Sequence, residues 1–427
     1  MKVYEDYVNL RYRPKKTDVI GEFYVEPYRC NIKNAAGAVA SESSTGTWTE
    51  VTTDKKSIHK LGARVFSINK NIIKVAYPIQ LFEPGNMPGL LSGIAGNIFG
   101  MKLVKNLRLL DIHFPEKLVK SFPGPMYGIP GIRKILRVKK RPLVGTIVKP
   151  KLGLHPRQHA EVAYKAWIGG CDIVKDDENL TSQSFNTFEK RTLLTIKAKQ
   201  LAEKITGEKK IYMPNITAEL QEMLDRAEFV KRLGNEYVMV DVCTLGWSAL
   251  QTLRNFNKHL RLVLHAHRAG HAAFTRDKKH GISMLVVAKL CRLIGLDQLH
   301  IGTIVGKMEG PKEEVIDIDQ EIEKELIKKD SPGHILEQKW YGLKPMFAVS
   351  SGGLHPGHVP ALIKYLGKNV ILQFGGGIHS HPRGTEAGAK AARQALDATL
   401  EGIGLKKYAK HHQELKEILD KFGYPKR

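Results

Sequence analysis

Two lysines near the middle of the chain, Lys149 and Lys151, have a spacing that could support proton transfer. They follow an apolar run in the segment TIVKPK, and a spacing of two puts both side chains on the same side of an extended chain. Two neighbouring ammonium groups disfavour each other's positive charge, so one lysine could act as a base while the other binds a phosphate. The alternative is that both are ordinary surface lysines.

Three acidic residues follow Lys175 in the segment KDDEN, directly after another apolar run. In an extended chain Lys175 and Asp177 share one face, and Glu178 lies at the following turn. Magnesium prefers carboxylate oxygens, so the segment predicts a hard-cation site. An ammonium group cannot bind magnesium, but a carbamate formed from Lys175 and carbon dioxide presents an oxygen ligand and removes the positive charge. A solvated turn or a helix cap is the alternative.

The segment HAHRAGH, residues 265–271, ends a third apolar run. His265 and His267 point the same way along a strand, which makes a zinc site conceivable, but no Cys or Glu ligand follows at a matching spacing. A general acid or base beside an anion-binding arginine fits the pattern better, with Arg268 in the second role.

Glycine-rich segments follow the later apolar runs. His300 leads into GTIVGKMEG, where glycines on both sides of Lys307 predict a mobile loop that brings a cation to the site. Met308 excludes a P-loop, which needs Ser or Thr at that position. The segments SSGG (350–353) and QFGGG (373–377) offer backbone N–H groups to a phosphate. Together the segments predict one metal cluster, one base and two anion positions, which matches a sugar bisphosphate.

The elements that must position these side chains repeat a pattern of an apolar run, a polar break and a helical stretch. There are eight such runs, at residues 143–148, 172–174, 211–213, 237–242, 262–267, 299–305, 347–350 and 370–374. Helical periodicity lies at 160–168, 188–205, 218–233, 283–294, 360–366 and 386–400. The pattern predicts an α/β fold, a (β/α)8 TIM barrel over residues 125–427, with its active site at the carboxyl ends of the strands. A doubly wound sheet is the alternative, but no GxGxxG follows the first run.

Residues 1–124 show a different pattern and predict an α+β N-terminal domain. Residues 7–13 and 65–77 alternate as half-buried strands do, and residues 89–101 resemble a helix of small residues. Two prolines and a glycine at 122–125 predict the boundary. At the other end of the chain, residues 406–427 predict a terminal amphipathic helix.

The composition narrows the class of protein. The chain has 427 residues, of which 42% are hydrophobic and 26% charged, as in ordinary globular proteins. The most apolar stretch, 282–296, is interrupted by Lys289 and Arg292, so no membrane span is expected. The four cysteines are far apart without a CxxC pair, and the first eight residues lack an apolar signal region. We therefore expect a cytoplasmic protein without a disulfide framework.

The charge balance is strongly basic. There are 67 Lys and Arg residues against 43 Asp and Glu residues, a formal charge of +24. A solvated surface, an anionic substrate or nucleic acid could each account for it. The densest run, 133–141, contains no aromatic residue for stacking on bases, so a solvated surface is preferred there and nucleic acid is disfavoured.

These motifs, in this order, resemble the large subunit of ribulose-1,5-bisphosphate carboxylase/oxygenase (RuBisCO). The resemblance covers nearly the whole chain and rests on GTIVKPKLGL, GGCDIVKDDENL, HAHRAGH, GTIVGKMEG, SSGGLHPG and QFGGG. The segments HAHRAGHAAFTR and NMPGLLSGIAGNIFG look most like the archaeal form III branch. The resemblance implies a carboxy-lyase that converts ribulose 1,5-bisphosphate and carbon dioxide to two molecules of 3-phosphoglycerate through a magnesium-stabilised enediolate. Oxygen would compete with carbon dioxide.

The resemblance also implies roles for individual residues. Magnesium would be bound by Lys175, as the carbamate formed with activating carbon dioxide, and by Asp177 and Glu178. Lys149 would remove the C3 proton of the substrate, His267 would accept a proton during hydration, and Lys307 would stabilise the carboxylated transition state. The implied substrate-binding residues are Lys151, Arg268, His300, Ser351, Gly352, Gly353, Gln373, Phe374, Gly375 and Gly376, together with Glu42, Thr47 and Trp48.

The last three residues belong to the segment 42–48, which resembles a family stretch that completes the active site of a neighbouring subunit. The resemblance therefore implies a homodimer or a ring of dimers, with no small subunit. It also implies a role in the degradation of AMP and other nucleosides or in a related pentose bisphosphate route. One departure is Gly89, where plant-type members have an Asn near the metal and substrate, and Asn86 is a candidate replacement. A RuBisCO-like enolase or isomerase acting on a phosphorylated sugar or thiosugar is the alternative function.

Overall fold

The computed structural model describes residues 2–305, 311–328 and 336–424. By its internal contacts the chain divides into two compact units. The first comprises Met1–Gly124, Gly270–Gly295 and Lys324–Leu343, and the second comprises Pro125–Ala269, Leu296–Glu323 and Lys344–Arg427. The sequence-based boundaries of 1–124 and 125–427 remain a prediction, because compactness does not show which part folds by itself.

The second unit contains the predicted barrel. Within the described residues eight parallel strands form one sheet in the order β7-β6-β5-β15-β14-β11-β9-β8. Their bounds are β5 Leu143–Ile147, β6 Ile173–Lys175, β7 Ile211–Met213, β8 Tyr237–Asp241, β9 Val263–His267, β11 Gln298–Gly302, β14 Phe347–Ser351 and β15 Val370–Phe374. Beyond the ends of β7, Met239 of β8 accepts a hydrogen bond from the Ile216 amide at 3.0 Å and donates one to the Pro214 carbonyl at 2.9 Å. These two bonds close the sheet into a (β/α)8 barrel, and the predicted fold class is confirmed.

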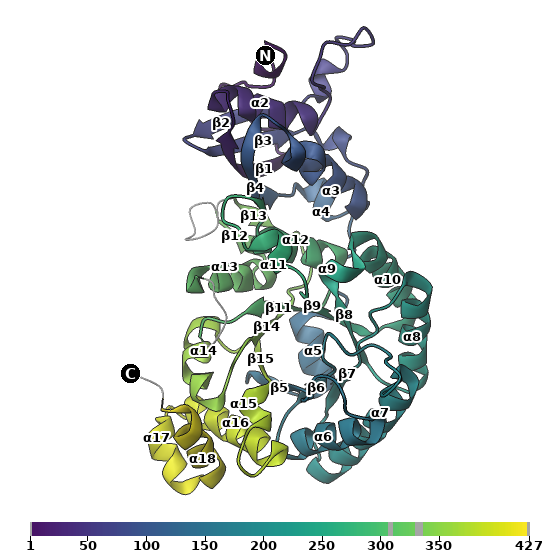
Figure 1. Ribbon diagram of the computed structural model, residues 1–427, viewed down its shortest axis with the longest axis vertical. Coiled ribbons are helices and arrows are strands. Elements are labelled where there is room, and N and C mark those ends of the chain that lie inside the picture. Colours follow the sequence, from purple (N-terminus) through teal and green to yellow (C-terminus); the bar gives the residue numbers. More distant parts are fainter. Residues whose placement is uncertain (1, 306–310, 329–335, 425–427) are drawn as a thin grey trace. The chain divides into compact units, whose positions relative to one another are not determined.

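Helices lie around the outside of the strands (Figure 1). In the second unit they include α6 Pro156–Ile168, α7 Phe188–Thr206, α8 Leu220–Arg232, α9 Val242–Leu245, α10 Trp247–Leu260, α13 Lys312–Glu323, α14 Val359–Leu366, α15 Gly376–His379, α16 Thr385–Leu400, α17 Leu405–Tyr408 and α18 Gln413–Phe422. A further helix, α5 (Gly128–Leu136), packs Ile129, Ile132 and Leu136 against the first residues of several strands, such as Leu143 and Ile173. Helix α5 therefore closes the amino-terminal end of the barrel with apolar side chains and leaves the carboxyl end for polar groups.

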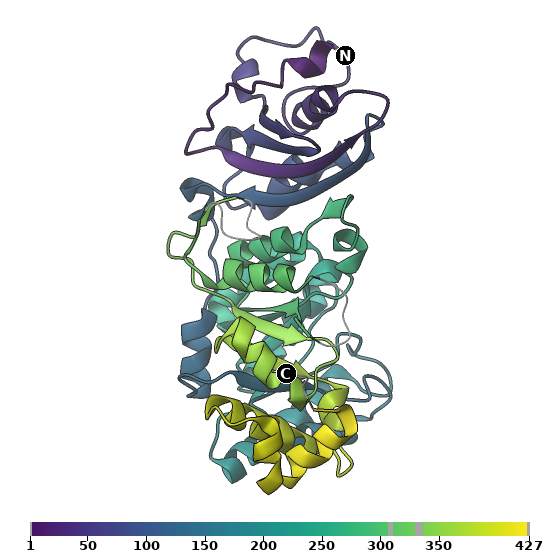
Figure 2. The same cartoon turned by 90° about the vertical axis from the view of Figure 1, so that its left-hand side faces the viewer.

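The first unit contains a five-stranded sheet in the order β10-β4-β1-β3-β2. The strands are β1 Val19–Pro27, β2 Arg64–Asn69, β3 Ile72–Tyr77, β4 Val104–His113 and β10 Gly281–Ile282, and β10 pairs in parallel with β4 whereas the other pairs are antiparallel. Helix α2 (Ile32–Glu42) packs on β1 and β2, and Figure 2 shows this sheet from the side. Other elements are α1 Lys2–Glu5, α3 Met87–Ala95, α4 Glu116–Val119, α11 Ala272–Thr275, α12 Met284–Ile294, β12 Leu326–Ile327 and β13 Gln338–Lys339.

The sequence pattern was less informative within residues 1–124 and over residues 406–427. Residues 7–13 do not form the predicted strand. The Tyr12 backbone amide donates to the Asn9 carbonyl in a turn, and only Val8 forms a β-bridge, with Val65. The predicted strand 65–77 is two strands, β2 and β3, which reverse at Lys70, where φ is +52°. The helical prediction at 89–101 corresponds to α3 followed by a 3-10 turn at Asn97–Gly100, and the prediction at 406–427 corresponds to α17, a 3-10 turn and α18.

No helix in the described parts of the chain combines the length and the apolar character needed to cross a bilayer.

Candidate active site

The polar strand ends predicted from the sequence gather at one rim of the barrel. Lys175, His267 and Ser351 are the last residues of β6, β9 and β14, Lys149 follows β5, and Gly375 follows β15. Parallel strands share their direction, so these positions lie at the same end of the sheet. Hydrogen bonds and ion pairs then connect the side chains into three groups, and His267 is joined to the first of them through Glu178.

The first group surrounds the Lys175 side chain, which is fully buried. Its Nζ donates to the Asp176 carbonyl at 2.8 Å and to Met239 Sδ at 3.3 Å, and it lies 3.8 Å from Glu178 Oε2. Burial lowers the pKa of the Lys175 amine, although the charges of Glu178, Asp177 and Asp241 oppose that shift. The neutral amine is the form that adds to carbon dioxide, so the environment of Lys175 favours the chemistry of carbamate formation.

Lys149 and Asp177 form the second group. The Lys149 Nζ lies 2.5 Å from Asp177 Oδ2, and Asn179 donates to Asp177 Oδ1 through its side chain at 3.0 Å and its backbone at 3.1 Å. Burial would raise the pKa of Asp177, but these hydrogen bonds from Lys149 and Asn179 hold it below its ordinary value. Asp177 is therefore ionised and carries a carboxylate suited to a hard cation.

His267 is fixed by an aspartate that the sequence analysis did not select. Its Nδ1 lies 3.1 Å from Asp241 Oδ1, at the end of β8, and its Nε2 lies 3.6 Å from Glu178 Oε2. A carboxylate on one ring nitrogen sets the orientation of the imidazole and leaves the other nitrogen for proton transfer. The available signal was the position of Asp241, the last residue of a barrel strand.

The third group is a chain of hydrogen bonds through two histidines. His265 Nδ1 contacts Gln298 Oε1 at 2.7 Å, His265 Nε2 contacts His300 Nε2 at 2.9 Å, and His300 Nδ1 contacts Ser351 Oγ at 2.7 Å. Burial lowers the pKa of His265 to about 3 and that of His300 well below its ordinary value. Both rings are neutral near pH 7, so they orient Ser351 without adding positive charge.

The donor atoms of these groups can be compared with those that a metal ion needs. Across the described residues no three His, Cys, Asp or Glu side chains are arranged to hold a metal ion. Asp177 and Glu178 supply two carboxylates for a hard cation, and the buried amine of Lys175 beside Glu178 is where a carbamate would supply a third oxygen. The donor set therefore fits magnesium bound by a carbamylated lysine and two carboxylates.

Arg268 occupies one of the two predicted anion positions. Its Nη2 approaches Gly302 so closely that a Cβ built on this glycine would lie 2.6 Å away, and Gly302 has φ of +95°. Burial lowers the pKa of Arg268 to about 10, and the guanidinium stays charged at neutral pH. Gly302 therefore makes room for a cation beside the end of β11.

The glycines after β15 form the other predicted anion position. A Cβ built on Gly375 would lie 3.6 Å from Lys149 Cε, and one built on Gly376 would meet open space. Gly352 and Gly353 follow β14 and have φ of +124° and +69°, which other residues rarely adopt. By contrast, the side chains of Gln373 and Phe374 are fully buried.

Five predicted site residues are not members of these groups. Lys151 is exposed beyond β5, and Lys307 lies at 306–310, outside the described residues. Glu42 and Trp48 line a cavity of about 500 Å³ in the first unit, together with Tyr4 and residues 100–103, and Trp48 is 78% exposed. Thr47 lies in the same segment, and its role stays a prediction.

Asn86 is the candidate replacement for the Asn that plant-type members have at the position of Gly89. Its side chain forms hydrogen bonds within its own segment. Its Oδ1 accepts from the Gly89 amide at 2.9 Å, and its Nδ2 donates to Glu83 Oε2 at 2.6 Å. The residue thus caps the amino terminus of α3.

A buried network behind the rim holds the cation-binding segment in place. Asp176 points away from Lys175 and Asp177, and its carboxylate accepts from Arg191 Nε at 3.0 Å, from the Tyr212 hydroxyl at 2.7 Å and from the Asn215 amide at 3.0 Å. The His159 ring lies 3.1 Å away. Burial would raise the pKa of Asp176, but the charge of Arg191 and the hydrogen bonds hold it below its ordinary value. In the sequence Asp176 is only one of three consecutive acids, and the pattern does not reveal these partners.

Comparisons with known proteins give a consistent result. The family model described as "Ribulose bisphosphate carboxylase large chain, catalytic domain" matches residues 128–422, and the corresponding N-terminal domain model matches residues 6–118. The curated ribulose bisphosphate carboxylase of Methanosarcina mazei is 54% identical over 422 residues, covering 98% of this chain and 99% of the relative. That of Methanocaldococcus jannaschii is 50% identical over 425 residues, covering 97% of this chain and 99% of the relative.

Solved structures match over the same length. The dimeric archaeal Rubisco of Hyperthermus butylicus has a TM-score of 0.94 at 45% identity, covering 99% of this chain and 100% of that one. The octameric enzyme of Pyrococcus horikoshii, solved with sulfate, has a TM-score of 0.92 at 46% identity, covering 99% of this chain and 98% of that one. The similarity therefore extends over both units and over the whole of each relative.

Proposed function

The chain belongs to the ribulose bisphosphate carboxylase large-chain family, and we propose that it adds carbon dioxide to ribulose 1,5-bisphosphate to give two molecules of 3-phosphoglycerate. The observation that carries the proposal is the convergence of Lys149, Lys175, Asp177, Glu178 and His267 at one rim of the barrel. The relatives reported above are named carboxylases, so the enolase or isomerase alternative is not favoured.

The metal and the activating carbon dioxide belong to the proposal. Lys175, as a carbamate, would hold magnesium with Asp177 and Glu178. When bound, magnesium supplies a Lewis acid that stabilises negative charge on the oxygens of the enediolate. The lowered pKa of the Lys175 amine, caused by burial, supports carbamate formation at this residue.

The proton transfers are assigned to two side chains. Lys149, whose side chain is 33% exposed, is the proposed base that takes the C3 proton of the substrate. His267 has one ring nitrogen engaged by Asp241, so its Nε2 is the proposed acceptor of a proton from the water that hydrates the carboxylated product. Lys307 is assigned to the carboxylated transition state by family resemblance.

The two phosphates are assigned to opposite sides of the rim. One phosphate would lie near Arg268 and His300, and the other on the Gly375–Gly376 turn, with Lys151 near the reacting carbons. Ser351, Gly352 and Gly353 would contact the sugar and its phosphate, supported by the 2.7 Å contact that orients the Ser351 hydroxyl. Gln373 and Phe374 are assigned to substrate binding by the family resemblance. A guanidinium and backbone N–H groups are groups that commonly bind phosphate.

The proposal also covers the assembly of the chain, its reaction with oxygen and its metabolic role. The archaeal relatives of known structure are described as dimeric and octameric, which supports a homodimer or a ring of dimers for this chain. Glu42, Thr47 and Trp48 would then complete the site of a second copy. Oxygen would compete with carbon dioxide for the enediolate. A role in the degradation of AMP and other nucleosides rests on the family resemblance alone.

A labelling experiment tests the carboxylase assignment. The protein is preincubated with carbon dioxide and magnesium and then given ribulose 1,5-bisphosphate with labelled bicarbonate. Label should enter 3-phosphoglycerate, Lys149→Met should abolish it, and Lys165→Met, which alters only an exposed ion pair with Glu161, should not. Absence of label from folded wild-type protein would refute the proposed reaction.

A further inference from the structure

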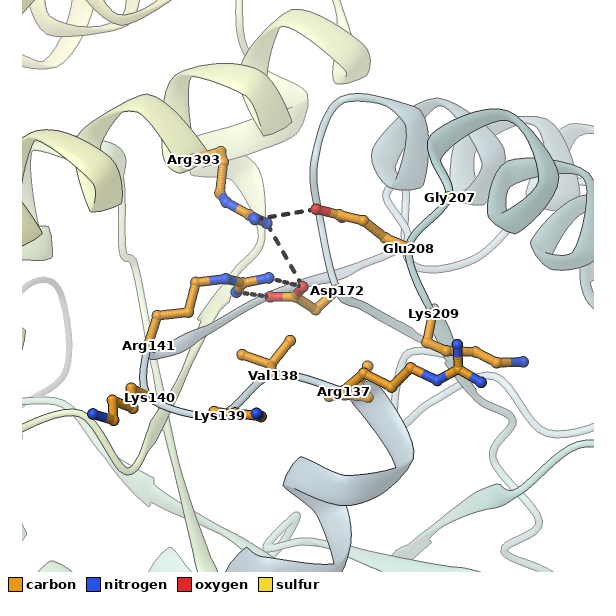
Figure 3. Close-up of a pocket in the computed structure, with 11 residues that line it drawn as sticks. Arg137, Val138, Lys139, Lys140, Arg141, Asp172, Gly207, Glu208, Lys209 and Arg393 are labelled. Carbon is orange, nitrogen blue, oxygen red and sulfur yellow. Dashed lines mark hydrogen bonds and ion pairs between the residues drawn. The ribbon is translucent and has the colours of Figure 1, made fainter.

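A second cavity lies at the end of the barrel opposite the candidate active site. It has a volume of about 370 Å³ and is formed where β5, β6 and β7 begin. Four parts of the second unit line it: residues 136–141 after α5, Asp172 before β6, residues 207–209 between α7 and β7, and Arg393 of α16 (Figure 3). None of these residues belongs to the proposed carboxylase site.

Ion pairs build the wall of this cavity. Asp172 is 1% exposed, and its two oxygens accept from Arg141 at 2.6 Å each (Figure 3). Arg393 lies 3.6 Å from Asp172 and 3.3 Å from Glu208. The prediction that 133–141 is a solvated surface is therefore wrong for Arg141, whose guanidinium is committed to a bidentate pair, and for Arg133, which donates to Asn369 Oδ1 at 2.7 Å.

The remaining basic residues have no comparable partners. Arg137, Lys139 and Lys140 are exposed and make no side-chain hydrogen bond or ion pair within the described part of the chain. Lys209 pairs with Glu203 at 3.6 Å, outside the cavity lining. Six basic and two acidic residues line the cavity, which leaves a formal charge of +4. Their ion-pair partners outside the lining, Glu203, Asp397 and Lys210, bring it to +3.

Two helix ends reduce this surplus without cancelling it. Helices α5 and α7 end at Leu136 and Thr206, next to the cavity, and each C-terminus carries roughly half a negative charge. The two ends together offset about one positive charge, so about two remain. A concave site with this charge attracts a dianion more strongly than a monoanion.

We propose that this cavity binds a small phosphate compound carrying at least two negative charges. Its volume lies near the lower end of the range of small-molecule sites, about 300 to 1,000 Å³, which excludes a large ligand. Arg137 supplies a planar fork that matches phosphate oxygens, and Lys139 and Lys140 supply point charges. The paired Arg141 and Arg393 form a preorganised wall, because Asp172 and Glu208 fix their side chains.

Calorimetric titration of the intact protein with inorganic pyrophosphate tests this proposal. The cavity variant combines Arg137→Asn, Lys139→Gln and Lys140→Gln, and asparagine suits the left-handed conformation of Arg137, whose φ is +58°. The control variant combines Lys406→Gln, Lys407→Gln and Lys410→Gln, which removes the same charge from exposed lysines of another segment. An Arg268→Ala variant separates binding at the carboxylase site from binding in the cavity.

We expect one equivalent of pyrophosphate per chain to be lost, or its affinity to fall about tenfold or more, in the cavity variant only. That equivalent should persist in the Arg268→Ala variant, and carboxylase activity at saturating substrate should be unchanged in the cavity and control variants. Equal binding by wild type and cavity variant would overturn the proposal, and so would an equal loss in the control variant. Loss of the cavity equivalent in an inactive protein would support this site while contradicting the proposed carboxylase function.

Discussion

Replacing Arg191 by methionine removes the positive partner of the buried carboxylate of Asp176. Arg191 on α7 and Asp176 after β6 are both fully buried, and the Arg191 Nε lies 3.0 Å from Asp176 Oδ2. The guanidinium also donates to the Asn186 carbonyl at 2.8 Å and to the Thr181 carbonyl at 2.6 Å. The substitution therefore leaves one carboxylate and two carbonyl groups without these donors, and methionine fills most of the space.

The expected loss of stability follows from the burial of the pair. Breaking a buried ion pair by removing one partner costs about 3 to 5 kcal/mol, because the remaining charge stays away from water. The Tyr212 and Asn215 contacts to Asp176 persist, which argues for the lower half of that range. The matched control is Arg232→Met, which removes an exposed pair with Glu228 at 3.7 Å and should cost about 0 to 1 kcal/mol.

Urea denaturation of both variants, followed by circular dichroism, measures the difference. The Arg191→Met variant should also need a higher magnesium concentration for half-maximal activation, because Asp176 lies between Lys175 and Asp177 in the chain. A double variant with Asp176→Leu and Arg191→Met removes both charges and should recover part of the lost stability. Equal losses for Arg191→Met and Arg232→Met would refute the reasoning.

Three further predictions concern the candidate active site and its assembly. Lys175→Met should abolish turnover and tight magnesium binding while circular dichroism stays unchanged; a wild-type rate would contradict the assignment of the carbamate. The pKa of His265 is lowered from 6.5 to about 3 by burial, so the unfolded chain binds a proton that the folded chain does not between these values. Unfolding free energy should therefore fall by up to about 1.4 kcal/mol per pH unit below pH 6.5, and His265→Gln should remove this contribution; equal pH slopes would contradict it. Trp48→Ala should change unfolding free energy by less than about 0.5 kcal/mol, because the side chain is 78% exposed, yet abolish activity. Co-assembly of Trp48→Ala with Lys175→Met chains should restore about a quarter of wild-type activity, because random dimers contain intact sites at that frequency. Failure of complementation in verified hybrid dimers would exclude shared sites.

The barrel could be predicted from the sequence because its signal is local. Each strand is a short apolar run followed by a polar segment, and the predicted run at 211–213 coincides with β7. The first unit gave a weaker signal, because the strand predicted at 7–13 depends on pairing with a distant segment. In the structure Val8 makes a single bridge to Val65, and the residues beyond it turn at Asn9.

Some residues of the candidate site could likewise be predicted from the sequence, and others could not. Lys149, Lys175 and His267 lie at or just after the ends of strands and could be found from their position, since the barrel end collects polar residues. The pairing of Asp241 with His267 and the partners of Asp176 could not, because which carboxylate meets His267 or Arg191 depends on how strands and helices far apart in the chain pack. Nor could the sequence distinguish Arg141, paired with Asp172, from Lys139 in the same basic run.

The closure of the barrel beside Met239 has a consequence for the partial unfolding of the barrel. At this seam the lateral bonds are few, and the Ile216 amide and the Met239 amide carry the closure. Adjacent to Ile216, Asn215 binds the carboxylate of Asp176 and donates to the Glu178 carbonyl at 3.1 Å. We therefore expect native-state hydrogen exchange to show subglobal opening that begins at this seam and releases the cation-binding segment before the rest of the barrel unfolds.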